Sequence, residues 1–552
     1  MDAVAELRIA ATTCEVVVAA SPPARSFPHS LAAAAFIVLW TVLNLLYLAF
    51  LCPHDLAPDE AHYWHWSRHL DWSYYSKGPL VAWLIRASCE PFGDTMFAVR
   101  LPAVLSSAAL LAGLYVLIAD VLHDRRLALG TILCAIALPG VSAGAVLMTI
   151  DPPFLACWCW SLVGLNRAIE RNSLGWWCIA GFCTALGVLA KYPMLLLPAA
   201  MWIWLARKRA GSVSDGRAES VASASGSLRV GLLVYSAITL LGCVPILIWS
   251  ANHDWVSLQH VLGQAGVNPD TEATWTTPLA YIGGQVGLLF GFWFVAVAAG
   301  AWRFRRTRDT GLSLAWWSSV PVWCVFLAAS FRTPSQLNWP AAAYVGGSVL
   351  AAAWLRDAWT SRGVRIGLIL AVILGSAYSF GLRFPQLFRP MIAAVLPQPS
   401  DGNPTPIRKL DPTTRLAGWR TLAAEIDRQR ERIREETGED PVLAGMTWTL
   451  PGELAFRCAG QPEVFSFGLA LADRHSQYDL WRPNPVSDPE AFRGRTFLYV
   501  GDRIPEFDSI FERVEEPIIV TQRERDVPLA RWTIWRCRGF RGFPERRTPI
   551  GY

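Results

Sequence analysis

The sequence predicts a polytopic α-helical membrane protein of about eleven transmembrane helices, followed by a small C-terminal soluble α/β domain. Composition is the first reason, because 53% of the 552 residues are hydrophobic and only 17% are charged, against about 25% in soluble domains. The second is a series of apolar runs between residues 31 and 383. The third is a change after about residue 384, where Pro, Arg, Glu and Asp reach soluble-domain density.

The apolar runs define a membrane domain that we expect to cover residues 30–384. Each run approaches the roughly 20 residues that a spanning helix needs. They lie near 31–51, 97–119, 127–148, 152–168, 174–191, 193–206, 230–250, 278–301, 312–331, 338–356 and 364–383. The first run is too long for a signal peptide and lacks a small-residue cleavage site, so we expect a retained helix behind a disordered cytoplasmic tail, residues 1–29.

Residues 385–552 predict the soluble α/β domain. A helix rich in Glu and Arg is expected near its start, and four short runs have the composition of strands. The helix covers 416–437, and the strands cover 442–445, 496–500, 517–520 and 532–535.

The distribution of Lys and Arg predicts the orientation. Alternate loops are rich in them, as in 207–209 and 303–308, whereas none occurs between Asn252 and Thr277. Under the positive-inside rule the N-terminus is then cytoplasmic. The first large loop, 52–96, and the C-terminal domain are expected on the extracytoplasmic face of the cell inner (plasma) membrane.

The net charge limits the classes of partner that are expected, and the positions of the cysteines limit the disulfides that could form. The net charge of +5 comes without a basic run interleaved with exposed aromatics, so no nucleic-acid partner is expected. Most cysteines lie in apolar runs, where Cys packs as a small hydrophobe. Two pairs outside these runs, Cys52 with Cys89 and Cys458 with Cys537, could form disulfides in an oxidising compartment.

Candidate reactive residues gather at the outer ends of the apolar runs. Asp59 and Glu60 begin the first outer loop, Asp151 precedes two prolines, and Lys191 ends a run. A pore or pump would more often hold ionisable groups within the membrane. Structural alternatives remain, since Asp59 or Asp151 could cap a helix and Lys191 could complement a helix C-terminus.

Lys77 has the weakest structural explanation of these residues. It stands before Gly78-Pro79 and an apolar run, close to a predicted helix N-terminus, where a cation opposes the helix dipole. A bound anion would remove that conflict. The segment therefore predicts a phosphate site.

His62, His65 and His69 share one face of a predicted helix, together with Tyr63, Trp64 and Trp66 on its surface. Such a face could bind a metal. We favour a polar face at the membrane interface, with the aromatic side chains as an interfacial anchor.

With these residues identified, the chain resembles the GT-C membrane glycosyltransferases. Within them it is similar to the superfamily of dolichyl-phosphate-mannose protein mannosyltransferases and lipid A aminoarabinose transferases. The segments that carry the resemblance are Pro58-Asp-Glu-Ala-His-Tyr63, Asp71-Trp-Ser-Tyr-Tyr-Ser-Lys-Gly-Pro-Leu80, Thr149-Ile-Asp-Pro-Pro-Phe154, Leu189-Ala-Lys-Tyr-Pro193, His253-Asp-Trp-Val-Ser257, Asn338-Trp-Pro-Ala-Ala-Ala-Tyr344 and Ser476-Gln-Tyr-Asp-Leu-Trp481. The chain departs from the aminoarabinose transferases in its smaller helix count and in the Gly-Pro after Lys77.

The resemblance implies an enzyme that moves one sugar, with inversion, from a polyprenyl-phosphate carrier to a lipid, glycan or protein acceptor on the outer face. It implies that Asp59 is the general base, which chemistry supports because the acceptor hydroxyl must lose a proton. Glu60 and Asp151 would orient substrates or stabilise charge.

The donor phosphate would lie against Lys77 and Lys191, with Arg332 as a weaker third cation. Tyr74 and Tyr75 would line the sugar pocket. We assign no metal ligand and no required cofactor, because a lipid-phosphate donor does not demand a metal, although a divalent ion is possible.

Two other functions compete with this one. A transporter or flippase for a polyprenyl-linked sugar would share the apolar runs and the lysines, but it would not need Asp59-Glu60 at a loop, and it should show internal repeats. A membrane scaffold would not need reactive groups gathered on one face.

Overall fold

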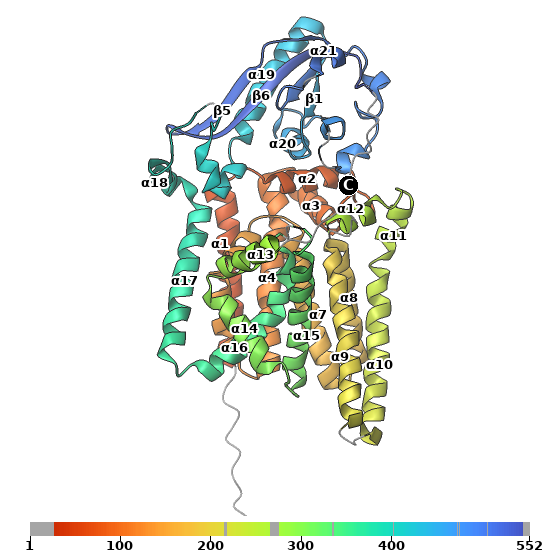
Figure 1. The fold of residues 1–552 in the computed structure, drawn as a ribbon, viewed down its shortest axis with the longest axis vertical. Coiled ribbons are helices and arrows are strands. Elements are labelled where there is room, and N and C mark those ends of the chain that lie inside the picture. The colour runs from red at the N-terminus through yellow and green to blue at the C-terminus, as the bar shows by residue number, and fades with distance from the viewer. Residues whose placement is uncertain are drawn as a thin grey trace, which may run out of the picture.

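The computed structural model describes residues 27–214, 218–264, 275–333, 336–400, 402–471, 473, 475–504 and 506–544. The predicted tail therefore lies mostly outside the described residues. The chain forms a helical bundle at one end and a small sheet domain at the other (Figure 1). This arrangement agrees with the predicted mostly helical membrane protein with a C-terminal α/β domain.

The long helices of the bundle run roughly side by side (Figure 1). They are α1 (Phe27–Leu46), which continues as a π-helical turn (Tyr47–Leu51), α4 (Met96–Leu122), α5 (Arg125–Ala135), α7 (Asp151–Arg171), α8 (Leu174–Ala190), α9 (Leu196–Ser214), α10 (Ala218–Leu241), α14 (Phe292–Phe304), α15 (Thr310–Ala329), α16 (Ala343–Ala358) and α17 (Arg362–Arg383).

Other helices of the chain connect them. They are α2 (Pro58–Arg68), α3 (Leu80–Phe92), α6 (Pro139–Gly144), α11 (Val244–Ala251), α12 (Val256–Gln264) and α13 (Thr276–Leu288).

A strict test of helix length and apolarity finds fewer membrane spans than the eleven that the sequence predicts. Within the described residues four helices pass it unbroken, 28–51, α4, α15 and α17, and up to six spans result if two bent helix pairs count as one span each. The pair α10 and α11 is bent by 41°, and the pair α13 and α14 by 107°. The predicted run 127–148 is likewise split into α5 and α6. The count of eleven is therefore not confirmed, although the chain is a multi-pass membrane protein.

The two ends of the bundle differ in what they carry. The arginine-rich turns between α4 and α5, α7 and α8, α14 and α15, and α16 and α17 lie away from the sheet domain (Figure 1). The helices α2 and α3 lie next to the sheet domain, at the opposite end. The described parts of the loops that the positive-inside rule assigned to the outer side thus share the end that carries the C-terminal domain.

The C-terminal domain holds a mixed sheet of six strands. Strands β1 (Val442–Gly445), β2 (Val464–Ser466) and β3 (Phe497–Val500) are parallel, in the order β2-β1-β3. The long strand β6 (Val527–Phe540) pairs antiparallel with β3, β4 (Phe511–Val514) and β5 (Ile518–Glu524). Around the sheet lie α18 (Arg389–Ala394), α19 (Trp419–Thr437), α20 (Thr449–Arg457) and α21 (Phe507–Ile510). The four predicted strands correspond to β1, β3, β5 and part of β6.

One hydrophobic core is shared between α2, α3, the start of α4 and the C-terminal domain. Helix α20 crosses α2 so closely that a Cβ on Gly452 would lie 2.7 Å from the carbonyl carbon of Ala61. Only glycine allows this approach. Helix α2 is therefore clamped between the bundle and the sheet domain.

The predicted aromatic anchor on α2 is wrong for this reason. Trp64 and Trp66 are fully buried and Tyr63 nearly so, and the Trp64 indole donates a hydrogen bond to Asp94 Oδ1 at 2.8 Å. These rings face protein, because α20 and its neighbours cover the surface that the sequence left open to the membrane interface.

The two cysteine pairs that the sequence left open do not form disulfides. Cys52, Cys89, Cys458 and Cys537 are free thiols. Cys458 and Cys537 belong to two separate hydrophobic cores of the C-terminal domain, and Cys52 instead accepts a hydrogen bond from Arg100 at 3.4 Å.

Candidate active site

Asp59 stands between two cavities at the start of α2. Its helix begins with Pro58 at the first position and has Ala57 as its N-cap. Asp59 is thus not the capping residue, and its side chain is exposed on the walls of both cavities. Trp448, from the C-terminal domain, is the other residue that lines both.

The smaller cavity is a polar cleft of about 140 Å³. Segments far apart in the chain meet there: the start of α2, the turn before α3, the start of α7, the end of α8, helix α12, the segment 336–339, Trp448 and the segment 475–476. Its charged and polar lining includes Asp59, Lys77, Asp151, Lys191, Asn338 and His475. Two predicted phosphate-binding lysines and two predicted catalytic aspartates therefore share one cleft.

Asp151 and Lys191 form an ion pair in the wall of this cleft. Lys191 Nζ donates to Asp151 Oδ1 at 2.7 Å, and Asn338 Nδ2 donates to Asp151 Oδ2 at 2.7 Å. Lys191 is buried and Asp151 is 19% exposed. Asp151 makes no capping bond at the start of α7, so its carboxylate is turned toward the cleft rather than toward its own helix.

The turn that carries Lys77 is held against the end of α8. Ser73 Oγ and the Tyr74 amide donate to the Lys77 carbonyl at 3.3 and 3.1 Å. A Cβ on Gly78 would lie 2.2 Å from the Leu189 carbonyl oxygen. Glycine at this position thus lets the Lys77 turn approach the end of α8, where Lys191 follows.

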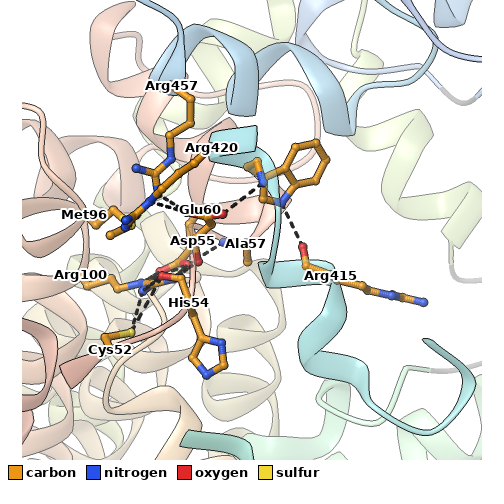
Figure 2. A network of polar contacts seen from close by, with 11 residues as sticks. Cys52, His54, Asp55, Ala57, Glu60, Met96, Arg100, Arg415, Arg420 and Arg457 are labelled. Carbon is orange, nitrogen blue, oxygen red and sulfur yellow. Dashed lines mark hydrogen bonds and ion pairs between the residues drawn. The ribbon is translucent and has the colours of Figure 1, made fainter. Parts of the chain in front are cut away.

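Glu60 is adjacent to Asp59, but its side chain faces the protein interior rather than a cavity. It is fully buried and accepts hydrogen bonds from Arg100 Nη2 at 2.7 Å and Nε at 2.9 Å (Figure 2). The amides of Ala57 and Met148 each add a bond of 2.8 Å. Glu60 lines neither cavity described here. The predicted direct role for Glu60 stays a prediction, and this position does not support it, because all of its acceptor sites are engaged inside the protein.

The same network ties the C-terminal domain to the membrane domain. Asp55 accepts from Arg420 Nε at 3.0 Å, from Arg457 Nη2 at 2.8 Å and from the Trp419 amide at 3.1 Å (Figure 2). Arg100 Nη2 donates to the Asp55 carbonyl at 2.6 Å. The loop just before Asp59 is therefore fixed from both domains.

Two further residues that were predicted to belong to the site lie away from the cleft. Tyr74 is fully buried, stacks on Trp66 and donates its hydroxyl to backbone carbonyls, so it does not line a sugar pocket. Arg332 is exposed and does not line the cleft. Tyr75 does line the cleft. In each of these adjacent pairs one residue lines the cleft (Tyr75, Asp59) and its neighbour is buried in the protein (Tyr74, Glu60).

The larger cavity has a volume of about 480 Å³ and lies between α17, α6 and the C-terminal domain. Most of its surface is apolar, and His54, Arg383, Arg408 and Arg415 supply its basic groups. Burial, and then the neighbouring cation Arg415, lower the pKa of Arg408. An anion bound beside these two arginines would relieve their mutual repulsion.

Several cleft residues were not assigned a role from sequence. Asn338 and the 476–481 segment lay within the motifs of the family resemblance, and Gln477 Oε1 accepts a hydrogen bond from the Tyr75 amide at 2.7 Å. His260 and His475 also line the cleft, and burial lowers the pKa of His475. No local pattern marks His260 and His475, because they reach the cleft from segments that are distant in sequence from Asp59.

Comparisons with known sequences agree with the resemblance. The dolichyl-phosphate-mannose-protein mannosyltransferase family matches residues 76–249. A lipid A galacturonosyltransferase of Rhizobium johnstonii is 27% identical over 363 residues, which cover 64% of this chain and 71% of that protein. An undecaprenyl phosphate-alpha-4-amino-4-deoxy-L-arabinose arabinosyl transferase of Pseudomonas fluorescens is 26% identical over 312 residues, which cover 50% of this chain and 53% of the relative.

Solved structures give the same fold. ArnT from Cupriavidus metallidurans matches with a TM-score of 0.58 in its apo state and 0.59 bound to undecaprenyl phosphate, at 15% and 16% identity. Each match covers 91% of this chain and 98% of that protein. The likeness therefore extends over the bundle and the C-terminal domain together.

Proposed function

Because the chain belongs to the GT-C superfamily of membrane glycosyltransferases, we propose that it transfers a sugar from a polyprenyl-phosphate carrier to an anionic glycolipid such as lipid A. The observation that carries the proposal is the position of Asp59 between a polar cleft with two lysines and a larger, mostly apolar cavity. A donor phosphate suits the first, and an amphipathic acceptor suits the second.

Asp59 acts as the general base in this proposal. Its carboxylate takes the proton of the acceptor hydroxyl, and the acceptor oxygen forms a bond to the anomeric carbon. The bond between that carbon and the phosphate oxygen breaks, and its electron pair leaves with the polyprenyl phosphate. A single displacement of this kind inverts the anomeric centre, and phosphate leaves without needing a strong acid.

The donor phosphate binds at Lys77 and Lys191. Their charges stabilise the negative charge that the phosphate gains as the sugar leaves. Asp151 accepts a 2.7 Å hydrogen bond from the Lys191 ammonium, and Asn338 holds Asp151 in place through a second bond of 2.7 Å. Asp151 also lines the cleft, where it can orient a sugar hydroxyl. Tyr75 supplies an aromatic wall.

The acceptor enters the larger cavity from the side of the membrane helices. Arg408 and Arg415 suit the phosphate groups of a glycolipid, while the apolar wall suits its acyl chains. The named activities of the two sequence relatives, on lipid A and with an undecaprenyl-phosphate sugar, support this pairing. The reaction would occur on the extracytoplasmic face of the inner membrane, where the positive-inside rule puts this end of the bundle.

The test is transfer by the purified full-length protein in liposomes. Lipid A serves as acceptor, a panel of undecaprenyl-phosphate-linked sugars serves as donors, and mass spectrometry records the gain of one sugar. We expect Asp59→Asn to slow transfer at least 100-fold, since general base catalysis contributes about 10²–10⁴-fold, while binding of undecaprenyl phosphate stays as in the wild type.

Asp508→Asn is the matched control, because Asp508 is 86% exposed on the C-terminal domain. Normal turnover by Asp59→Asn would remove the assigned base. Movement of a labelled donor across the vesicle without any sugar transfer would instead favour the flippase alternative.

A further inference from the structure

Three side chains outside the proposed site form a cluster where α2 meets the C-terminal domain. His65 and His69 lie four residues apart at the end of α2, and Glu463 lies just before β2. The ring nitrogens Nε2 of both histidines face the Glu463 carboxylate, at 3.4 Å for His65 and 3.3 Å for His69. The donor atoms of the three residues all lie within 4.8 Å of one another.

We propose that His65, His69 and Glu463 bind a divalent transition-metal ion, with zinc as the best match. Two imidazoles and one carboxylate, with the fourth position left to water, form a ligand set that zinc uses in proteins. The spacing of the two histidines, with three residues between them, is also a zinc-ligand spacing.

The distances agree with a tetrahedral ion. Two ligand atoms that are each about 2.0–2.1 Å from zinc lie roughly 3.3–3.4 Å apart. His65 Nε2 lies at this distance from Glu463 Oε2, and His69 Nε2 lies at this distance from Glu463 Oε1. Because the ligand atoms of the three residues lie within 4.8 Å of one another, small side-chain shifts would complete the tetrahedron. A charge-assisted hydrogen bond between nitrogen and oxygen would be shorter, at about 2.7–2.9 Å. His69 and Glu463 are 40% and 53% exposed, so both can adjust to close the site around an ion.

The surroundings of His65 favour a metal ligand. The His65 side chain is only 1% exposed, so packing fixes the position of its ring. The Nδ1 atom of His65 lies 3.3 Å from the buried Tyr478 hydroxyl. The hydroxyl oxygen can accept a hydrogen bond from Nδ1–H, which leaves the lone pair of Nε2 for the ion. Trp481 packs on the rings of His65 and His69, with centroids 5.1 and 4.5 Å away.

The nearest cation does not block the site. Arg68 lies between the two histidines in sequence, but its guanidinium reaches the Gln461 carbonyl at 3.3 Å and covers the Trp64 ring. An ion at this position would cross-link α2, which carries Asp59 at its other end, to the segment that leads into β2. The ion thus fastens the C-terminal domain over the membrane domain (Figure 1).

The test measures metal binding rather than sugar transfer, so its outcome is independent of the proposed function. The full-length protein is stripped with a chelator in detergent, incubated with zinc chloride and freed of excess metal. We expect the wild type to retain one more equivalent of zinc than His69→Gln or Glu463→Gln. Both variants are at partly exposed positions and preserve side-chain hydrogen bonding. We expect zinc to bind each at least about tenfold more weakly, the least that losing even an outer-shell partner costs.

Zinc should also raise the melting temperature of the wild type, because it binds only the folded cluster, and it should not raise that of either variant to the same extent. His123→Gln is the control, since His123 is exposed at the other end of the bundle. Zinc retained at other histidines contributes equally to the wild type and the variants, so it does not affect the difference in zinc content between them. Equal zinc content in wild type and His69→Gln would overturn the proposal and leave the cluster as a hydrogen-bonded triad.

Discussion

Two carboxylate–cation pairs lie at the same end of the membrane helices, yet they have opposite surroundings. Glu60 and Arg100 are 0% and 1% exposed, and backbone amides take up the remaining acceptor sites of Glu60. Asp151 and Lys191 are 19% and 8% exposed and lie in the wall of the polar cleft. A buried ion pair whose hydrogen-bonding sites are all occupied holds the nearby backbone in place. An ion pair that lines a cavity leaves its charges accessible to a substrate.

The largest expected effect breaks the first pair. Glu60→Gln keeps the side-chain shape but leaves the Arg100 guanidinium buried without a counter-charge, which should cost about 3–5 kcal/mol of unfolding free energy. Thermal unfolding in detergent measures the loss. Asp59→Asn, one residue away and exposed, should stay within about 0.5 kcal/mol of the wild type. Equal melting of the two variants would contradict the structural role of Glu60.

The pH dependence of the protein's stability tests the buried Glu60–Arg100 region through His54. The carbonyl of His54 accepts a hydrogen bond from Arg100 Nη1. Burial lowers the pKa of the His54 imidazole to about 4, and this effect outweighs the hydrogen bond to the Leu382 carbonyl, which raises the pKa. The unfolded chain takes up this proton near pH 6.5 and the folded chain only near pH 4. Stability is therefore full above pH 6.5 and falls by up to about 3 kcal/mol as the pH drops to 4.

The measurement is the melting temperature of wild type and His54→Gln between pH 7.5 and 4.5. Gln can still donate to the Leu382 carbonyl but does not titrate, so its curve should be flatter. Other buried histidines add the same slope to both proteins and cancel. Parallel curves would show that His54 is not the source.

The smallest expected effect concerns the second pair. Lys191→Gln keeps a hydrogen bond to Asp151 but removes the cation, so the Kd for undecaprenyl phosphate should rise about 10- to 100-fold, as for the loss of one charged hydrogen bond. Its melting temperature should change less than that of Glu60→Gln. Lys409→Gln, at an exposed position outside the cleft, is the control. An unchanged Kd for Lys191→Gln would remove this lysine from the donor site.

Local pattern was informative for the elements and for the exposed ends of helices. Strand β1 covers the same four residues that its composition predicts, and the apolar runs became helices even where they bend or break. Lys77 was singled out because a cation at a helix start opposes the dipole, and it does line the cleft. Burial by another domain leaves no such local signal, which is why Trp64 and Trp66 were expected at a membrane interface.

The sequence by itself determined that the chain is a multi-pass helical membrane protein with a soluble domain, and that its candidate reactive groups collect at one end of the bundle. Hydropathy and charge act within single segments, so they can be read without a fold. Only the tertiary structure decided which of two adjacent residues faces a cavity. Neighbours on a helix point about 100° apart, so when Glu60 turns inward to Arg100, Asp59 is left facing the cavities.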